Sequence, residues 1–545
     1  MNIRDRVPPT MVAAVRLART RLTLAGFLDS AERRQRRAAT AALAALPRAA
    51  GTANRRVLVF SLRGGWYPHT AWEAVLGQAL QIRGAAVHVF NCGGVMPICE
   101  VNFRHADPRI ACAECRLYPD TLVGALGLER SWLADYLTGA DRAEIAAAVD
   151  RVTPGQYEAW TFDARPVGAL VRNSVLWFLR KSRLDLAADD AVVYRDFLVA
   201  GAHIARIAPR LLAATRPDVI VELNGLFFAE QILNSFAPPG SRVATYEAGW
   251  RMNSLGFDWL GAAGFADVDV PWGRLKNQPL TSQESATLDA WIDSRRAGDM
   301  QRDFYVRFDA GAPAHALSAV GLKPDVPTAV LFTNLVWDTA VFGRDTGFRS
   351  IQDWLRDTVE WFRQHSERQL VIRIHPAEDL RPSQESNEKL SDIVRSLTLP
   401  SNTVMVPSAA PLSSYALIEA ASAVMVYTST AGLEAALYGK RVLVGARVYY
   451  AGRGFTQNVD GRQAIGPQLE EAFARPDLTS DERDLARRFA YLLLFRFLHN
   501  MPVVKQRPRA LPLLAPEEAV QLAPGRGELD ALLEGLLSGA PLARL

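Results

Sequence analysis

Residues 424–440 read Val-Met-Val-Tyr-Thr-Ser-Thr-Ala-Gly-Leu-Glu-Ala-Ala-Leu-Tyr-Gly-Lys. A short apolar run passes through a turn of hydroxyl residues and Gly432 into a helical pattern, which is typical of the strand–helix unit around a parallel sheet. The first N–H groups of a helix can bind an anion, and Ser429 and Thr430 can cap the helix or donate to a phosphate. Gly432 lets a ligand come close to the backbone. An ordinary helix cap is the alternative interpretation.

Strand–helix alternation extends outward from this unit along most of the chain. Short β-branched runs, each followed by an amphipathic stretch, occur in two sets. The first set is Val57–Phe60, Val87–Phe90, Val219–Glu222 and Val243–Tyr246, and the second is Ala329–Thr333, Leu370–Ile374, Val404–Val406, Ala423–Tyr427 and Arg441–Val444. Because each set can build one parallel sheet, the sequence predicts an α/β protein with two Rossmann-like domains.

Composition indicates where these domains begin and end. We expect an N-terminal helical segment at 1–54, a first Rossmann-like domain at 55–309, a linker at 310–327, a second Rossmann-like domain at 328–510 and a tail at 511–545. The linker is rich in alanine, glycine and proline. A helical pattern without a clear strand covers residues 116–215, so extra helices are expected in the first domain as well as at the N-terminus.

The overall composition is that of an ordinary globular chain. The 545 residues are 49% hydrophobic and 22% charged, with a net charge of +4 spread along the chain, which argues against a nucleic-acid partner. Between Met11 and Phe27, Arg16, Arg19 and Arg21 interrupt the apolar residues, so neither a spanning helix nor a secretory signal is expected. We therefore expect a cytoplasmic protein. The alternative is peripheral contact of this segment with the inner face of the cell membrane.

A histidine lies at the end of another expected strand. The stretch Leu370-Val-Ile-Arg-Ile-His-Pro-Ala-Glu378 places His375 at the carboxyl end of an apolar run, where open α/β sheets bind their ligands. An imidazole there can hydrogen-bond a phosphate or protonate a leaving group, and Arg373 adds a cation if it faces the site. A polar loop histidine is the alternative interpretation.

Three motifs together carry a family resemblance. They are the His375-Pro376 loop, the Ser-Thr-x-Gly-x-Glu turn from Ser429, and Gly445-Ala-Arg-Val-Tyr-Tyr-Ala-Gly-Arg-Gly-Phe-Thr456. Over about residues 328–460 the chain resembles the capsule polysaccharide biosynthesis family, which includes Kdo transferases. The resemblance implies a GT-B type fold, with its two Rossmann-like domains facing a cleft, and a glycosyltransferase without a catalytic metal. It suggests a nucleotide-sugar donor such as CMP-Kdo and a surface or capsular polysaccharide or glycolipid acceptor.

The resemblance also assigns residues to the donor. His375 would face the donor phosphate as a catalytic residue, beside Pro376. The other donor-binding residues carried over by motif are Ser429, Thr430, Gly432, Glu434, Tyr450, Gly452 and Gly454. Asn334 and Asp338 follow the opening strand of the second domain and would lie at the cleft. A turn-forming asparagine and a helix-capping aspartate are the alternatives for these two residues.

The first expected domain supplies candidate acceptor residues. A glycine loop follows the first strand, so Arg63, Gly64 and Gly65 are expected to border the acceptor, and His69 could act as an acid, a base or a hydrogen-bond donor. Asn224, at the end of a later strand, is expected on the same side. A tight structural turn is the alternative interpretation of the glycine loop.

A single carboxylate is the other catalytic candidate of the first domain. The stretch Tyr246-Glu-Ala-Gly-Trp-Arg251 stands where the resembling family has an acidic-acidic-Gly motif that activates the acceptor. Ala248 replaces the middle acid, so Glu247 is the sole carboxylate and the stereochemical course stays open. We expect Glu247 to be catalytic. A structural ion pair with Arg251 or Arg63 is the alternative.

All four cysteines of the chain lie close together in the sequence. They form the pattern Cys92-x6-Cys99-x12-Cys112-x2-Cys115. Such clustering in a cytoplasmic protein favours structural zinc over disulfides, and the second pair has the usual knuckle spacing. Three side chains between the pairs could replace a cysteine as ligand: Glu100, His105 and Asp107. Buried reduced thiols are the alternative.

Two other functions stay open at this point. A CDP-polyol phosphotransferase of the teichoic-acid type shares the two-domain fold and a similar phosphate turn. A non-catalytic scaffold of a polysaccharide assembly complex is favoured by the alanine at position 248. Neither the nucleotide of the donor nor the oligomeric state follows from the sequence.

Overall fold

The chain divides into two compact units. The computed structural model describes residues 30–47, 55–102, 108–259, 261–266, 268–296, 313–379, 386–507 and 511–544, with several positions between 11 and 22. The first unit comprises Met1–Leu179, Leu184–Ala266 and Phe497–Arg544, and the second comprises Arg180–Arg183, Asp267–Arg496 and the terminal Leu545. The division therefore falls after Ala266, earlier than the expected linker at 310–327. The segment after Phe497 belongs to the first unit, neither to the second domain nor to a separate tail.

The first unit is built on a seven-stranded sheet. Its strands are β1 (Arg56–Phe60), β2 (Ala86–Asn91), β3 (Glu129–Trp132), β4 (Val219–Leu223), β5 (Arg242–Ala248), β6 (Ser254–Trp259) and β13 (Leu498–Asn500). The order β3-β2-β1-β4-β5 is parallel throughout, which is the strand order of a Rossmann-like domain. Antiparallel β6 and β13 extend the sheet beyond β5. The pairing of Leu498 with Gly256 brings the end of the chain back to this unit.

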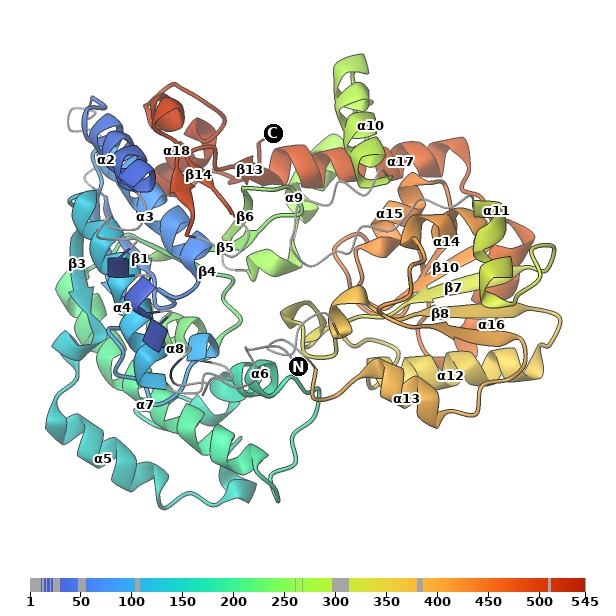
Figure 1. Cartoon of the computed structure of the whole chain (residues 1–545), viewed down its shortest axis with the longest axis horizontal. Helices are drawn as coiled ribbons and strands as arrows, with labels where there is room; N and C mark the ends of the chain where they lie inside the picture. The colour runs from blue at the N-terminus through green and yellow to red at the C-terminus, as the bar shows by residue number, and fades with distance from the viewer. Residues whose placement is uncertain are drawn as a thin grey trace. The chain divides into compact units, whose positions relative to one another are not determined.

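Helices cover both faces of this sheet (Figure 1). They are α2 (Ser30–Ala44), α3 (Tyr67–Ile82), α4 (Pro108–Ala125), α5 (Gly139–Val149), α6 (Val167–Leu179), α7 (Asp190–Thr215), α8 (Phe228–Ser235) and α18 (Asp530–Ser538). Alternate side chains of a strand point to opposite faces. Val57 and Val59 accordingly pack with α3 and α4, whereas Leu58 and Phe60 pack in the core formed by α5 to α8.

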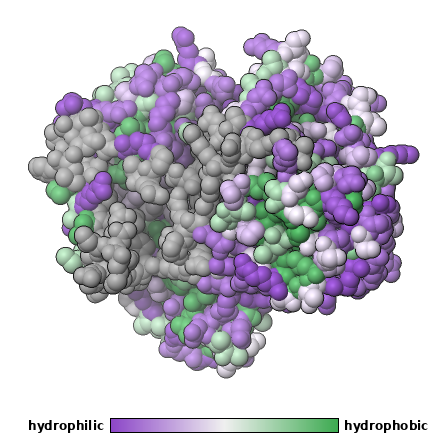
Figure 2. All heavy atoms as spheres, turned by 45° about the vertical axis from the view of Figure 1, so that its right-hand side comes forward, coloured by the Kyte–Doolittle hydropathy of each residue, from purple (hydrophilic) through white to green (hydrophobic). Residues whose placement is uncertain are grey.

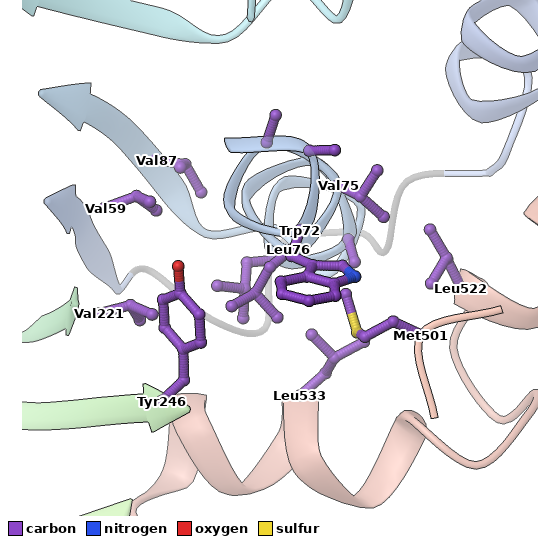
Figure 3. Close-up of a cluster of buried hydrophobic side chains, with 14 of the residues drawn as sticks. Val59, Trp72, Val75, Leu76, Val87, Val221, Tyr246, Met501, Leu522 and Leu533 are labelled. Atoms are coloured by element: carbon purple, nitrogen blue, oxygen red, sulfur yellow. The ribbon is translucent and has the colours of Figure 1, made fainter. Parts of the chain in front are cut away.

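The C-terminal segment completes one of these two cores. Val59, Val87 and Val221 project from the strands toward Trp72 of α3, and Met501, Leu522 and Leu533 close the cluster from the other side (Figure 3). Two short strands, β14 (Val504–Lys505) and β15 (Leu513–Leu514), and a 3₁₀ turn at Pro516–Leu522 carry this segment. The expected tail is thus part of the first hydrophobic core.

The second unit contains a six-stranded parallel sheet. Its strands are β7 (Thr328–Phe332), β8 (Gln369–Arg373), β9 (Thr403–Val406), β10 (Ala423–Val426), β11 (Val442–Val444) and β12 (Gln457–Asn458). The order β9-β8-β7-β10-β11-β12 is that of a complete Rossmann-like sheet. The prediction of two Rossmann-like domains is confirmed by the topology of the two sheets.

The second unit has nine described helices, some of which flank its sheet in the doubly wound manner (Figure 1). They are α9 (Asp269–Leu275), α10 (Ser282–Arg296), α11 (Pro313–Ala316), α12 (Ile351–Gln364), α13 (Leu390–Ser396), α14 (Ser414–Ala420), α15 (Ala431–Leu437), α16 (Arg462–Ala474) and α17 (Ser480–Tyr491). Figure 1 shows α12, α13 and α16 on one face and α14 and α15 on the other. Trp354 and Phe362 of α12 are buried with Ile465 and Leu469 of α16 against the strands.

The expectation for residues 116–215 needs one correction. Each strand expected from an apolar run is present within a residue or two of its predicted bounds. However, β3 lies inside the stretch that was expected to have no strand. Its sequence, Glu129-Arg-Ser-Trp132, has no apolar run because it is the edge strand of the sheet, and only one of its residues is buried.

One described helix, α7, is long and apolar enough to cross a bilayer. Within the first unit 67% of its most apolar window is buried, and its side chains form the centre of the core shared by α5, α6 and α8. Figure 2 shows mostly hydrophilic side chains on the described parts of one face, with apolar residues in smaller areas. The apolar character of α7 is therefore accounted for by packing inside the unit.

Candidate functional site

The loops that carry the predicted donor residues meet at one edge of the second sheet. In this strand order the direction of winding reverses between β7 and β10, and ligands of open α/β sheets bind outside the carboxyl ends of the strands at that point. Thr333 and Asn334 follow β7, His375 follows β8, and Thr428 and Ser429 follow β10. Since these strands are parallel neighbours, the three loops leave the sheet at the same edge.

Hydrogen bonds join the three loops directly. The backbone N–H of His375 donates to Thr333 Oγ1 at 2.9 Å. The backbone N–H of Thr428 donates to Asn334 Oδ1 at 3.3 Å. Asn334 is 8% exposed and links two strands that lie far apart in the sequence. This linking role is more specific than that of a turn-forming asparagine, and it holds the loops of His375 and Ser429 at the same edge of the sheet.

The ring of His375 has a defined tautomer. Its Nδ1 accepts the backbone N–H of Ala377 at 3.1 Å and caps the short turn Pro376–Glu378. The ring proton must therefore lie on Nε2. Burial, with the charge of Arg373, lowers the pKa of His375 to about 4. At neutral pH the ring is thus an uncharged donor through Nε2, suited to a phosphate oxygen and not to protonating a leaving group.

Arg373 is bonded to backbone carbonyls of a neighbouring loop. The side chain is 1% exposed, and its guanidinium donates to the backbone carbonyls of Pro407 and Leu412. Burial lowers the pKa of Arg373 to about 10. The residue therefore holds the loop after β9, and its contact with a donor stays a prediction.

The turn after β10 is held by a buried tyrosine. Tyr450 is fully buried, and its hydroxyl donates to the backbone carbonyl of Ser429. A Cβ on Gly432 would lie 2.3 Å from the Tyr450 hydroxyl, so this glycine makes room for Tyr450. The Ser429 hydroxyl accepts the N–H of Ala431 at 3.3 Å, and Thr430 begins α15. Ser429 therefore caps locally, as the alternative interpretation held.

Four other predicted donor residues have structural roles. Glu434 accepts from Arg295 at 2.6 Å and from Tyr415 at 3.1 Å. Asp338 caps the turn Thr339–Val341 through the N–H of Ala340, as the alternative interpretation held. The remaining two, Gly452 and Gly454, have φ angles of +70° and +93°. These angles show that the loop after Tyr450 requires glycine for its backbone conformation.

In the first unit, His69 is the end of a buried hydrogen-bond chain. His69 Nδ1 lies 3.2 Å from the hydroxyl of Tyr246, and that hydroxyl donates to Glu73 Oε1 at 2.7 Å. Ser61 donates to the other oxygen of Glu73. Burial raises the pKa of Glu73 to about 7 in spite of these bonds. Burial and the charge of Glu73 raise the pKa of Tyr246, so its hydroxyl keeps its proton.

This chain determines which nitrogen of His69 can accept a proton. A tyrosine hydroxyl has one proton to donate, and with an ionised Glu73 that proton goes to the carboxylate. His69 must then donate to Tyr246 through Nδ1, so the lone pair of the ring lies on Nε2. Glu73 and Tyr246 are functional candidates that the sequence did not indicate. They are separated by 173 residues, so no local motif contains both.

Glu247 lies near this chain on β5. Its Oε2 accepts from the side chain of Asn224 at 3.1 Å, and its Oε1 accepts the N–H of Ala248 at 2.8 Å. Asn224 also accepts the N–H of Leu226 through Oδ1. The same side chain therefore fixes the loop after β4 and orients the carboxylate of Glu247. Asn224 and Glu247 therefore form one polar pair at the carboxyl end of β4 and β5.

Arg63 is buried among acids. It is 6% exposed, donates to both oxygens of Glu230, and donates to Glu100 at 3.2 Å. Burial alone lowers the pKa of Arg63, but the charges of Glu100 and Glu230 outweigh burial and raise it. Phe227 covers the guanidinium at 4.7 Å from its ring centre. The side chain is therefore a buried structural cation, contrary to its expected place beside an acceptor.

The glycine loop after β1 serves packing. A Cβ on Gly64 would lie 2.0 Å from the carbonyl oxygen of Cys115, and one on Gly65 would lie 2.6 Å from Val101. Both glycines therefore let α4 and the preceding loop approach the sheet. The tight structural turn, which was the alternative interpretation, accounts for this pair.

The four cysteines line a common cavity of the first unit. All four are free, and burial raises the pKa of each thiol, with neighbouring thiols adding to the effect at Cys99, Cys112 and Cys115. Among the described residues, no group of three or more histidine, cysteine, aspartate or glutamate side chains is arranged to hold a metal ion. His105 and Asp107 lie outside the described residues. Structural zinc stays a prediction.

A groove of about 630 Å³ adjoins this cavity. It is bordered by Gly93 and Gly94 after β2, by Arg116 of α4 and by Trp132 at the end of β3. Arg116 and Arg130 both lie over the Trp132 ring, at 5.3 and 4.4 Å from its centre. No sequence motif indicated this groove, because Trp132 belongs to the strand that has no apolar pattern.

We predict that stability falls in mild acid because three histidines are held uncharged. Burial lowers the pKa of His375 and His203 to about 4 and that of His499 to about 3. An unfolded histidine titrates near 6.5, so between about pH 6.5 and 4 the unfolded chain binds more protons than the folded one. The stability is complete above pH 6.5 and is lost as the pH falls. Urea denaturation at pH 7 and pH 5 measures the change.

The slope of this loss has a specific expected value. The histidines account for an uptake of about two to three protons on unfolding, whereas Glu73, whose pKa burial raises to about 7, releases about one in the same pH range. His203→Gln should reduce the proton uptake by about one relative to the wild type, and an unchanged pH dependence in this variant would contradict the prediction.

The strand orders and the linked loops define a class of protein. The chain contains two Rossmann-like domains, and in the second, polar loops are linked at the topological switch point. Residues 311–476 match the family model described as capsule polysaccharide biosynthesis protein. The match covers less than half of the chain and contains the loops of Asn334, His375 and Ser429. It confirms the family resemblance of the second unit.

Solved structures give weaker matches. The beta Kdo 2,7 transferase of Thermosulfurimonas dismutans KpsC is 15% identical, with 58% of this chain and 87% of that chain covered and a TM-score of 0.33. The UDP-GlcNAc 2-epimerase from Neisseria meningitidis is 12% identical over 80% and 97%, with a TM-score of 0.25. The glycosyltransferase VinC in complex with DTDP is 13% identical over 80% and 95%, with a TM-score of 0.25. At these TM-scores the matches carry no argument about function. No curated protein matches the chain.

Proposed function

We propose that the chain is a glycosyltransferase of capsule or surface polysaccharide synthesis that uses a nucleotide-sugar donor. The observation that carries the proposal is the junction of three loops at the switch point of the second sheet, within the segment that matches the capsule polysaccharide family. This is the position where Rossmann-like domains bind nucleotides. The donor phosphate would approach the Nε2–H of His375 and the backbone near Ser429.

The proposed chemistry needs little charge from the second unit. Arg373 is committed to backbone carbonyls, so neutral N–H donors would stabilise the charge that develops on the leaving phosphate. Glu434 is paired with Arg295, which favours a structural role for this acid over direct contact with a sugar. CMP-Kdo stays the donor suggested by family resemblance, and other nucleotides are outcomes of the test below.

His69 is the proposed base that activates the acceptor hydroxyl. Its Nε2 carries the lone pair of the ring when Glu73 is ionised, and the Tyr246 hydroxyl holds the ring through Nδ1. Glu247 is the second candidate for this step, since it is a carboxylate at the end of a neighbouring strand. The two residues are distinguished by the variants described in the Discussion.

We predict that His375→Ala weakens nucleotide binding about 10- to 100-fold, because one hydrogen bond to a charged phosphate is lost. Thermal-shift screening of the full chain with CMP, CDP, UDP and GDP identifies the nucleotide first, since a ligand of the folded state raises its melting temperature. Calorimetric titration then gives the dissociation constants of the wild type and the variant.

His365→Ala is the matched control in the same unit. His365 stacks on Trp361 at 3.9 Å between ring centres and bonds its carbonyl, away from the three loops. Its replacement should leave nucleotide affinity unchanged. If no nucleotide binds the wild-type chain, or if both variants bind equally well, the proposed donor site is wrong. A phosphodiester product would favour the teichoic-acid type phosphotransferase.

A further inference from the structure

The cysteine-lined cavity of the first unit is separate from the proposed chemistry of the second. Its wall contains the only four cysteines of the chain: Cys92, Cys99, Cys112 and Cys115. The space between the side chains is about 20 Å³, which is the room that one water-sized particle needs. A single atom or ion fits there.

Three different elements bring the four thiols to this cavity. Cys92 follows β2 directly, and Cys99 stands just before the turn Glu100–Asn102. Cys112 and Cys115 are three residues apart on α4, so they lie on the same helix face. A Cβ on Gly94 would lie 3.1 Å from Cys112 Cβ, which shows how closely the loop after β2 approaches α4.

Backbone N–H groups are directed at three of the four sulfur atoms. The N–H of Gly65 donates to Cys115 Sγ at 3.2 Å. The N–H groups of Gly94, Val95 and Met96 bond Cys92, and the N–H of Asn102 bonds Cys99. Neutral thiols are weak acceptors, whereas thiolates bound to a metal carry negative charge that such donors stabilise. The backbone N–H groups around the cavity therefore resemble the outer shell of a metal–thiolate site.

We propose that this cavity binds one zinc-class ion through the four cysteine sulfurs and that the ion is structural. The sulfurs do not converge on one point as they stand, because no three such ligands are arranged to hold an ion. Binding therefore requires the sulfurs to move toward the central space, where Zn–S bonds of about 2.3 Å can form. Each thiol releases its proton to solvent as its bond to the metal forms.

The ion would fasten the carboxyl edge of the first sheet. It would join the end of β2, the loop before Glu100 and helix α4, and α4 already contacts the Gly64–Gly65 loop. Binding would be independent of the nucleotide site, so the proposal does not rest on the proposed function. Loss of the metal should lower the melting temperature of the chain by several degrees and increase the reactivity of all four thiols.

Elemental analysis of the full chain, purified without chelator and incubated with Zn²⁺ before desalting, tests the proposal. We expect about one zinc per chain. Cys112→Ser and Cys115→Ser should each reduce the zinc content at least several-fold. His88→Gln is the control, because it removes a potential ligand on β2 that bonds Ser131 and pairs with Glu129 instead of lining the cavity. Its zinc content should equal that of the wild type.

A second measurement on the wild-type chain does not depend on a variant that folds. Addition of Co²⁺ should produce the intense sulfur-to-cobalt charge-transfer absorption of a thiolate site, and Zn²⁺ should remove it. A chain that retains no zinc and gives no such absorption overturns the proposal. So does bound iron with inorganic sulfide, or a pair of disulfides among the four cysteines.

Discussion

Replacing His69 by glutamine should reduce the rate of sugar transfer by about 100- to 10,000-fold, which is the usual contribution of a general base. The affinity for the nucleotide should not change, because His69 belongs to the first unit and the proposed donor loops to the second. The loss of rate is expected because Tyr246 bonds both His69 and Glu73 in a buried hydrogen-bond chain. Initial rates with a saturating donor measure the loss.

The same chain predicts a pH dependence of the wild-type rate. Burial raises the pKa of Glu73 to about 7. Above that pH the carboxylate accepts the hydrogen bond of the Tyr246 hydroxyl, so His69 donates through Nδ1 and its lone pair lies on Nε2. Below it, protonated Glu73 can donate to Tyr246, which then donates to Nδ1 and places the ring proton on Nε2. The rate should therefore rise with pH through about 7.

Two further variants make the assignment specific. His88→Gln is the matched control, because His88 bonds Ser131 and Glu129 and does not belong to the hydrogen-bond chain of His69. The rate of this variant should equal that of the wild type. Glu247→Gln tests the competing base. If Glu247→Gln loses the activity and His69→Gln keeps it, then Glu247 is the base and the proposed role of His69 is wrong.

Arg63→Ala should reduce the free energy of unfolding by about 3–5 kcal/mol, which is the usual cost of removing one partner from a buried ion pair. Arg63 is the cation that Glu100 and Glu230 share, and burial raises the pKa of Glu230 and of neighbouring Glu222. Without the guanidinium these acids would be buried beside one another. Urea denaturation followed by tryptophan fluorescence measures the change.

An exposed ion pair supplies the comparison for this effect. Arg56 pairs with Asp218 at 3.6 Å and keeps 48% of its side chain exposed, so Arg56→Ala should cost no more than about 1 kcal/mol. Exchange of the buried charges for neutral groups, Arg63→Met with Glu100→Gln and Glu230→Gln, should recover part of the stability lost in Arg63→Ala. Equal losses in Arg63→Ala and Arg56→Ala would contradict the prediction.

Most strands of the second unit could be predicted from local sequence patterns. Apolar runs predicted its strands because a parallel strand is buried on both faces, as the fully buried residues of β7, β8 and β10 show. The end of a strand also predicts which loop faces the ligand edge, and His375 and Ser429 were found in this way. What Arg373 contacts depends on its direction from the strand and on a distant loop, and no pattern around it contains that information.

The first unit was less predictable because its key contacts join distant segments. Glu73 meets Tyr246 across 173 residues and Arg63 meets Glu230 across 167. The glycines of the loop after β1 were interpreted as room for a ligand, and they are room for α4. The division of the chain was missed for the same reason, since the return of β13 to β6 leaves no signal in composition.

The return of the last segment to the first core has a consequence for biosynthesis. Met501, Leu522 and Leu533 emerge from the ribosome only after the entire second unit has been made. The second unit can therefore close during translation, while the apolar side of α3 in the first unit stays open to water until this segment has been made. The second unit would thus fold before the first, although most of the first is synthesised earlier. Chaperones would bind the exposed apolar surface of the first unit.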